Sequence, residues 1–578
     1  MEHHAEVLRG GVWRPRAPSW PDAAAMVLIL SVFVLVGVGG HLASAPFAIA
    51  HQTAISLSPT ALPVYALQTT LRMFAALAAS LLFTLTYATV AAKSRRAEMV
   101  LIPLLDVLQS VPILGYLSFT VAFFVSLFPG RMLGPELAAI FAVFTSQAWN
   151  MAFSFYQSLR TLPTDLDEAA RGFRFSAWQR FWRLEAPFAV PGLVWNMMMS
   201  MSGGWFFVVA AEAISVGTVQ VNLPGVGSYV AMAIQNRDLD AVGWAILAMT
   251  LTILLIDQIL FRPMIVWAEK FRYEQSAAQS VAKSFVYDLF GRARDVKTVI
   301  APVGRLVSRA TRVRLALPAS VTRVAARTTT SRRGDVLWFG LLAAVVGSGA
   351  WVLVRHEAAV LSWRDVGIAA SNGGLTLFRV MILVALASLI WVPIGVFVGL
   401  SPKLAARVQP VAQFLAAFPA NLLFPVAVFL IVHFHAEPKI WLTPLMILGA
   451  QWYILFNVIA GASTFPTDFR EAASSFHIHG WRWWRDVMLP GIFPFYVTGA
   501  ITASGGAWNA SIVSEAVSWG PTKLNGSGLG AYIAEATYKG DFPRIILGVA
   551  VMSVMVIVVN RALWRPLYAL GERRTRLA

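Results

Sequence analysis

Long apolar segments separated by short polar ones make up most of this chain of 578 residues. A transmembrane helix needs about 20 mostly apolar residues to cross roughly 30 Å of hydrocarbon, because each residue adds about 1.5 Å. Twelve segments meet this requirement, in two sets of six on either side of a polar stretch at 263–335. We predict spans at 24–43, 64–92, 99–128, 136–159, 189–210, 241–262, 336–355, 376–400, 410–433, 441–460, 493–515 and 543–562.

The third predicted span contains Pro112, and the ninth contains Pro419 and Pro425. Proline removes a backbone donor and clashes with the preceding helical turn, so we expect both spans to be bent or broken. The segment 24–43 follows three arginines, as a signal peptide would. Its apolar run is too long for a signal peptide and predicts a retained anchor.

The composition supports a membrane protein and excludes several other classes. Hydrophobic residues make up 57% of the chain and charged residues 13%, whereas soluble domains carry about 25% charged residues. The same numbers exclude a disordered chain. The absence of cysteine removes disulfides, thiolate metal sites and cysteine nucleophiles. The net charge of +17 suggests either a nucleic-acid partner or basic residues gathered on the cytoplasmic side of a membrane.

The distribution of the basic residues decides between these two explanations. With both termini inside, the cytoplasmic loops hold 34 Lys and Arg and the external loops hold 6. Fourteen of the 34 lie in the stretch 263–335, and without them the ratio is still 20 to 6. The positive-inside rule therefore gives cytoplasmic N- and C-termini, and no nucleic-acid partner is expected. The basic stretch itself either lies on anionic lipid or is a flexible tether.

The second half of the chain repeats the first at an offset of 303 residues, which becomes 307 in the upstream part. A fixed register over about 190 residues indicates a six-helix module repeated in the same orientation, about an axis along the membrane normal. The predicted organisation is a cytoplasmic segment at 1–22, a first module at 23–262, a basic linker at 263–335, a second module at 336–566 and a basic tail at 567–578.

Each module has a cytoplasmic loop after its fourth span, at 160–188 and 461–492. The first contains EAARGFRFSAWQRFWRLEAP from Glu168, and the second contains EAASSFHIHGWRWWRDVMLP from Glu471. Both follow a Pro-Thr-Asp sequence that favours the start of a helix. Aromatic and basic residues then alternate as in a short amphipathic helix. Such a helix could lie on lipid headgroups, but two copies at equivalent places argue for a dedicated function.

With these loops the sequence resembles the membrane subunits of binding-protein-dependent ABC importers of the type I fold. In that family an EAA loop, with Gly at its seventh position and Leu-Pro at its end, forms a coupling helix that sits in a groove of the ATPase subunit. Here Arg174 and His477 replace the glycine, and Ala186 replaces the leucine of the first copy. The resemblance implies that the ATPase is contacted by Glu168, Ala169, Ala170, Phe173, Arg174, Trp178, Glu471, Ala472, Ala473, Phe476, His477 and Trp481.

Within this superfamily the sequence from Gly203 to Glu212, followed by Pro224-Gly225-Val226-Gly227, looks most like the nitrate, sulfonate, taurine and bicarbonate importers. The second copy repeats the pattern between Gly505 and Gly530. The resemblance implies an all-α permease of about 12 helices in the bacterial inner membrane, carrying a small solute, with an anion favoured. Its expected partners are two ATPase subunits, identical or different, a periplasmic or lipid-anchored solute-binding protein, and membrane lipid.

The chain contains no Walker-type phosphate-binding sequence, so it is expected to be a non-catalytic subunit. We expect it to bind no cofactor or metal, with ATP and Mg used by the partner subunits. Ionisable groups within a membrane are costly and are candidates for function, although structural pairing or snorkelling explains them equally well. The candidates for the translocation pathway are Arg72, Arg379, Gln109, Trp205, Glu212, Trp508, Asn509 and Glu515.

Three other classes compete with an ABC importer. An ion-gradient-driven secondary transporter would need no coupling loops, and transport that survives an uncoupler but not ATP depletion would exclude it. A membrane enzyme would need clustered acids or metal ligands, which the sequence does not offer. An ABC exporter half usually lacks the short Glu-Ala-Ala loops.

Overall fold

The computed structural model describes residues 55–271, 284–313 and 361–568, apart from positions 110, 217, 218 and 293, together with a few isolated residues. The predicted spans 24–43 and 336–355 lie outside these ranges. Ten predicted spans remain, and all ten fall on helices. Eight of them are helices that are long and apolar enough to cross a membrane by themselves.

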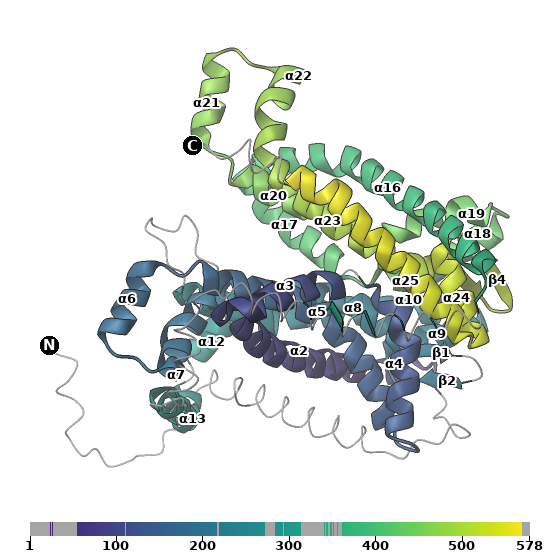
Figure 1. Cartoon of the computed structure of the whole chain (residues 1–578), viewed down its shortest axis with the longest axis horizontal. Helices are drawn as coiled ribbons and strands as arrows, with labels where there is room; N and C mark the ends of the chain where they lie inside the picture. The colour runs from purple at the N-terminus through teal and green to yellow at the C-terminus, as the bar shows by residue number, and fades with distance from the viewer. Residues whose placement is uncertain are drawn as a thin grey trace.

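The first module contains four helical segments that are long and apolar enough to cross a membrane, several short helices and one β-hairpin (Figure 1). Its elements are α2 (Leu62–Lys93), α3 (Arg95–Leu108), α4 (Ile113–Leu127), α5 (Leu133–Arg160), α6 (Thr164–Gly172), α7 (Ala177–Arg180), α8 (Ala186–Glu212), β1 (Ala213–Val216), β2 (Val219–Asn222), α9 (Val226–Asn236), α10 (Leu239–Ile256) and α11 (Arg262–Ala268). The linker adds α12 (Phe285–Arg292) and α13 (Arg294–Arg312).

The second module repeats this order of elements. They are α16 (Trp363–Gly399), α17 (Pro402–Ala417), α18 (Phe424–His433), α19 (Pro438–Trp441), α20 (Gln451–Ser463), α21 (Thr467–Ser475), α22 (Gly480–Trp483), α23 (Leu489–Ser514), β3 (Ala516–Trp519), β4 (Thr522–Asn525), α24 (Leu529–Lys539) and α25 (Phe542–Val559). The repeat extends to details, because Asp238 and Asp541 cap α10 and α25 with their side chains. Single π-helical turns also recur, at Phe181–Glu185 and Trp484–Met488.

Both proline-containing spans are broken, which confirms the expectation from the sequence. The first is divided into α3 and α4 by residues 109–112, and Pro112 immediately precedes α4. The second bends by 77° between α17 and α18, where Pro419 ends the first helix. The broken helices take part in contacts between the modules. The Ile113 amide donates to Asn509 Oδ1 of α23 at 2.8 Å, and Asn421 Nδ2 donates to the Phe206 carbonyl of α8 at 3.1 Å.

The two modules therefore share one packed interior. Residues of α4, among them Leu117 and Val121, belong to the core of the second module, and Ala417 and Leu422 belong to that of the first. Small residues let the helices approach closely, as at Gly399 against Ala462. Figure 1 shows α6/α7 and α21/α22 projecting separately toward one end of the molecule, with α9, α24 and the hairpins gathered at the other end.

Candidate functional site

The two loops that contain the Glu-Ala-Ala sequences, 160–188 and 461–492, are called the coupling loops, and they fold alike. Each consists of a nine-residue helix, α6 or α21, a tight turn, and a four-residue helix, α7 or α22, that continues into the next span. At the seventh position Arg174 and His477 have φ angles of 51° and 53°, in the left-handed region. The amides of Phe175 and Ile478 donate to the carbonyls of Ala170 and Ala473, which is the hydrogen bond of a Schellman helix end.

The turn therefore keeps the conformation that glycine adopts most readily. A left-handed backbone costs a residue with a Cβ roughly 1–2 kcal/mol. We expect Arg174→Gly to stabilise the first loop by up to about 1 kcal/mol, because glycine's larger entropy in the unfolded chain offsets part of the gain. Slower amide hydrogen exchange over residues 170–176 would show it. Arg171→Gly, inside α6, is the control and should exchange faster; exchange of Arg174→Gly at or above the parent rate would contradict the prediction.

Both loops expose apolar side chains on the tips that face away from the bundle. Phe173 is 72% exposed and Phe476, its equivalent, 78%. Glu168, Ala169, Glu471 and Ala472 are also exposed, whereas Ala170 and Ala473 are buried beneath the turn. Exposed aromatic residues surrounded by charge are typical of a surface that a protein partner covers. That these residues contact an ATPase stays a prediction.

The first coupling loop is held by a network of ion pairs. Glu185, which is buried, lies 2.8 Å from Lys93 Nζ at the end of α2 and 3.0 Å from Arg180 Nε. Arg180 also pairs with Asp167 of α6 at 2.6 Å. The second loop has no such network, because its equivalents of these four residues are Met488, Leu400, Trp483 and Arg470. Ion pairs thus join the first loop to the end of α2, whereas Met488 and Trp483 of the second loop pack in the apolar core.

The four ionisable candidates for the pathway form one arrangement in each module. Arg72 donates to Glu212 Oε1 at 2.7 Å and to both carboxylate oxygens of Glu136 at 2.6 and 2.7 Å. Arg72 and Glu212 are buried. In the second module Arg379 donates to Glu515 Oε1 at 3.3 Å and to the carbonyls of Gly526 and Ser527. We call these two arrangements the Arg–Glu locks.

A helix N-terminus completes each lock. Gly227 N donates to Glu212 Oε2 at 2.7 Å, and Gly530 N donates to Glu515 Oε2 at 2.8 Å. Both amides lie in the first turn of a helix, α9 or α24, where unpaired N–H groups and the positive dipole end bind carboxylates. In each module, the second glycine of the repeated Gly-x-Gly sequence therefore donates its amide to the glutamate of the lock. Sequence reasoning missed Glu136, whose second-module counterpart is not acidic.

Close backbone approach explains the second glycine of the motif. A Cβ at Gly227 would overlap the Val209 carbonyl oxygen of α8. We expect Gly227→Ala to lower the free energy of unfolding by about 1–3 kcal/mol, as overpacking does. Gly243→Ala is the matched control, because Gly243 is exposed on α10 with no atom within 4 Å of its Cβ position. Thermal unfolding of the purified proteins measures both, and equal midpoints would contradict the prediction.

The remaining pathway candidates lie at different depths. Trp205 and Trp508 are buried at equivalent places on α8 and α23. Gln109 is exposed at the end of α3. Asn509 is the candidate that lines a cavity between the modules, and the ionisable candidates are not in the lining. Assignment of all eight to the pathway stays a prediction, and the structure pairs the four charged ones with one another.

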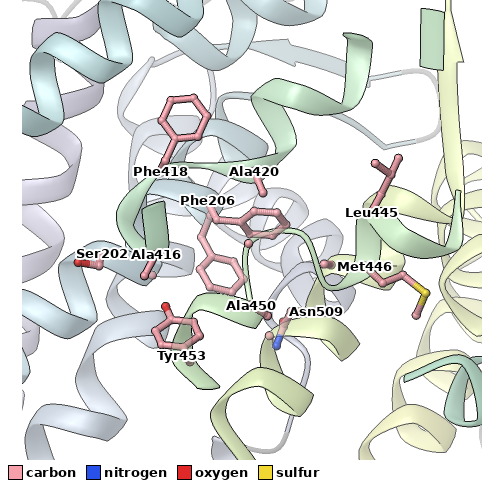
Figure 2. Close-up of a pocket in the computed structure, with 15 residues that line it drawn as sticks. Ser202, Phe206, Ala416, Phe418, Ala420, Leu445, Met446, Ala450, Tyr453 and Asn509 are labelled. Atoms are coloured by element: carbon pink, nitrogen blue, oxygen red, sulfur yellow. The ribbon is translucent and has the colours of Figure 1, made fainter. Parts of the chain in front are cut away.

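The cavity lies between α8 of the first module and α17, α20 and α23 of the second (Figure 2). Its volume is about 80 Å³. The lining contains no charged side chain and is mostly aromatic and small. Figure 2 shows Phe206, Tyr453 and Asn509 converging on the same space.

The end opposite the coupling loops is closed by contacts between the modules. The turn between β3 and β4 lies against the C-terminal end of α9, where Gly520 N donates to the Ile234 carbonyl at 2.9 Å. The Arg237 side chain packs on the same turn. The hairpins were not predicted from the sequence. Among the described residues, no group of three His, Asp or Glu side chains is placed to bind a metal ion.

Known proteins are similar to parts of this chain. The family model for the binding-protein-dependent transport system inner membrane component matches the chain twice, over residues 84–262 and 391–575. The bicarbonate transport system permease protein CmpB of Synechococcus elongatus is 27% identical over 177 residues, which cover 31% of this chain and 60% of that protein. The nitrate import permease protein NrtB of Synechocystis is 22% identical over 186 residues, covering 32% and 64%.

A third relative, whose name gives a different solute, is the glycine betaine/carnitine transport permease protein GbuB of Listeria monocytogenes. It is 28% identical over 170 residues that cover 29% of this chain and 54% of that protein. The match thus spans about three fifths of the length of these curated relatives. The two family matches together cover more than half of the chain, and each contains one coupling loop. The chain belongs to the family of binding-protein-dependent transport system inner membrane components, as a fused permease with two modules of the type I ABC importer kind.

Proposed function

We propose that this protein is the membrane-spanning subunit of an ATP-driven importer and forms the path for a small anion. The observation that carries the proposal is the pair of coupling loops, which recur in the two modules with the same fold, the same left-handed turn and the same exposed phenylalanine. Two equivalent docking surfaces at one end of the molecule suit a pair of ATPase subunits. The chain itself would bind no cofactor, and the partner subunits would use ATP and Mg.

The arrangement of the modules suits alternating access. The coupling loops stand apart at one end, and contacts such as that between Gly520 and Ile234 join the modules at the other. With the loops on the cytoplasmic side, as the basic residues predict, this is an inward-facing state. ATP-driven closure of the ATPase subunits would bring the loops together and separate the modules on the outside, where a solute-binding protein delivers its solute.

We propose that the cavity between the modules is a constriction on this path. Phe206, Phe207 and Phe418 line it, and its small volume would exclude a large solute. The Arg–Glu locks would then hold each module rigid during the movement, because their charged groups already bind one another within each module. An anionic solute is favoured by the resemblance to bicarbonate and nitrate permeases, and the passage of a desolvated anion would rely on neutral donors such as Asn509 and Tyr453.

Reconstitution tests the function directly. The full chain in proteoliposomes, with its co-purifying ATPase subunits and binding protein, should take up labelled nitrate or bicarbonate only when ATP is supplied to the ATPase side. An uncoupler should leave uptake unchanged, and an ATPase variant unable to hydrolyse ATP should abolish it. Uptake that continues without ATP and stops with the uncoupler would favour the alternative, a secondary transporter driven by an ion gradient.

A further inference from the structure

The linker helix α13 is attached to the first coupling loop. Trp178 Nε1 donates to the Ala310 carbonyl at 2.9 Å, and Gln179 Nε2 donates to the Arg312 carbonyl at 2.8 Å. The last carbonyls of a helix have no partner within it, so two side chains of α7 cap the C-terminal end of α13. In the part of the chain that the structure describes, no helix caps onto the second loop in this way, and Trp481, the equivalent of Trp178, is 73% exposed.

The sequence of α13 divides into an apolar and a basic face. Val, Ile and Leu recur at spacings of three and four residues, at 296, 299, 300, 303, 306 and 307. These spacings place them on one side of a helix. Basic residues at 294, 297, 305, 309 and 312 fall on the other side. This pattern is typical of helices that lie in a membrane interface, with apolar side chains among the acyl chains and basic ones at the headgroups.

The placement of α13 agrees with such a role. Figure 1 shows α13 nearly end-on beside α7, whereas α2 and α5 extend across the view, so α13 runs across the direction of the spans. Leu306, on the apolar face, is 68% exposed. Arg305, Arg309 and Arg312 have no carboxylate partner in the described part of the chain. Leu306 and these three arginines are therefore available, at the end of the module where basic residues predict the cytoplasmic leaflet.

We propose that α13 is an interfacial helix that binds anionic lipid headgroups and thereby ties the first coupling loop to the membrane surface. The attraction of cytoplasmic anionic lipid for each basic residue corresponds to about a fivefold change in partitioning. Charge complementarity selects lipid over a second protein as the occupant. Because Trp178 and Gln179 cap the same helix, lipid binding by α13 would restrict the movement of the first loop and leave the second free.

The absence of cysteine from the chain makes a site-directed test simple. The full chain carrying Leu306→Cys with a nitroxide label would be placed in nanodiscs of phosphatidylcholine alone or with a quarter phosphatidylglycerol. In the anionic nanodiscs we expect the label to be accessible to oxygen and protected from a water-soluble nickel chelate. A label at Ser308→Cys, on the polar side, should stay accessible to the chelate in both.

The charge requirement is tested with Arg305→Gln/Arg309→Gln, which should shift the equilibrium in anionic nanodiscs about 25-fold toward the aqueous state. Lys403→Gln/Arg407→Gln removes the same charge from the exposed start of α17 and should leave the label unchanged. Chelate access at 306 in both lipids, or equal protection in both, would overturn the proposal. Protection that develops only when an ATPase subunit binds would overturn it in favour of a protein contact.

Discussion

Arg72→Ala is expected to destabilise the protein more than any other single substitution in the first module. Removal of the guanidinium leaves the carboxylates of Glu212 and Glu136 without the cation that both contact at 2.6–2.7 Å. Breaking a buried ion pair from one side costs about 3–5 kcal/mol, because the remaining charge is uncompensated. We expect a steep fall in the thermal unfolding midpoint of the purified protein. We also expect much less of the protein to elute as a monodisperse peak in size-exclusion chromatography.

Arg379→Ala is the matched control in the second lock. Glu515 keeps donors from Thr376 and from the amides of Gly530 and Ala531, and Arg379 is partly exposed. Loss of hydrogen bonds to a charged group is expected to cost about 1–3 kcal/mol. A larger loss for Arg379→Ala than for Arg72→Ala would contradict the account of the locks. Normal folding of Arg72→Ala with impaired transport would instead place Arg72 on the solute path.

Trp481→Ala is expected to weaken binding of an ATPase subunit by about 30-fold or more, with the unfolding midpoint unchanged. Exposed aromatic anchors contribute about 2 kcal/mol or more to protein interfaces, and the Trp481 side chain is 73% exposed on α22. Surface plasmon resonance with the chain held in nanodiscs would measure the dissociation constant.

Two control variants make this prediction specific. Trp178→Ala should weaken ATPase binding less, because its indole already bonds to α13. Trp441→Ala removes an exposed tryptophan from α19 at the opposite end of the molecule and should have no effect. If all three variants bind the ATPase as the parent does, the second coupling loop is not the docking surface.

The sequence predicted the spans, the two broken helices and the duplication because these depend on local apolar length, proline and repetition. The Arg–Glu locks could be anticipated only in part. Opposite charges in one module, repeated at related offsets, suggested pairing, but Arg72 is 64 residues from Glu136 and 140 from Glu212. Nothing local indicates which acid folds back onto which base. The hairpins were missed because four-residue strands leave almost no periodic signal.

The coupling loops, too, could be predicted from the sequence only in part. Their position and boundaries follow from the Glu-Ala-Ala repeat and the prolines. Replacement of the usual glycine put the turn in question, and the structure keeps the left-handed turn with Arg174 and His477. The asymmetry between the loops could not be read from either loop alone, because it depends on Lys93 in α2 and on the distant helix α13.

The distance between the two coupling loops during ATP binding tests the central claim most directly. Gly172→Cys and Ser475→Cys place spin labels on the exposed last residues of α6 and α21, where a side chain at 172 meets no other atom within 4 Å. In a complex with bound ATPase subunits, double electron–electron resonance should show this distance shorten when ATP is added to a hydrolysis-deficient ATPase. An unchanged distance in that ATP-bound complex would contradict the account.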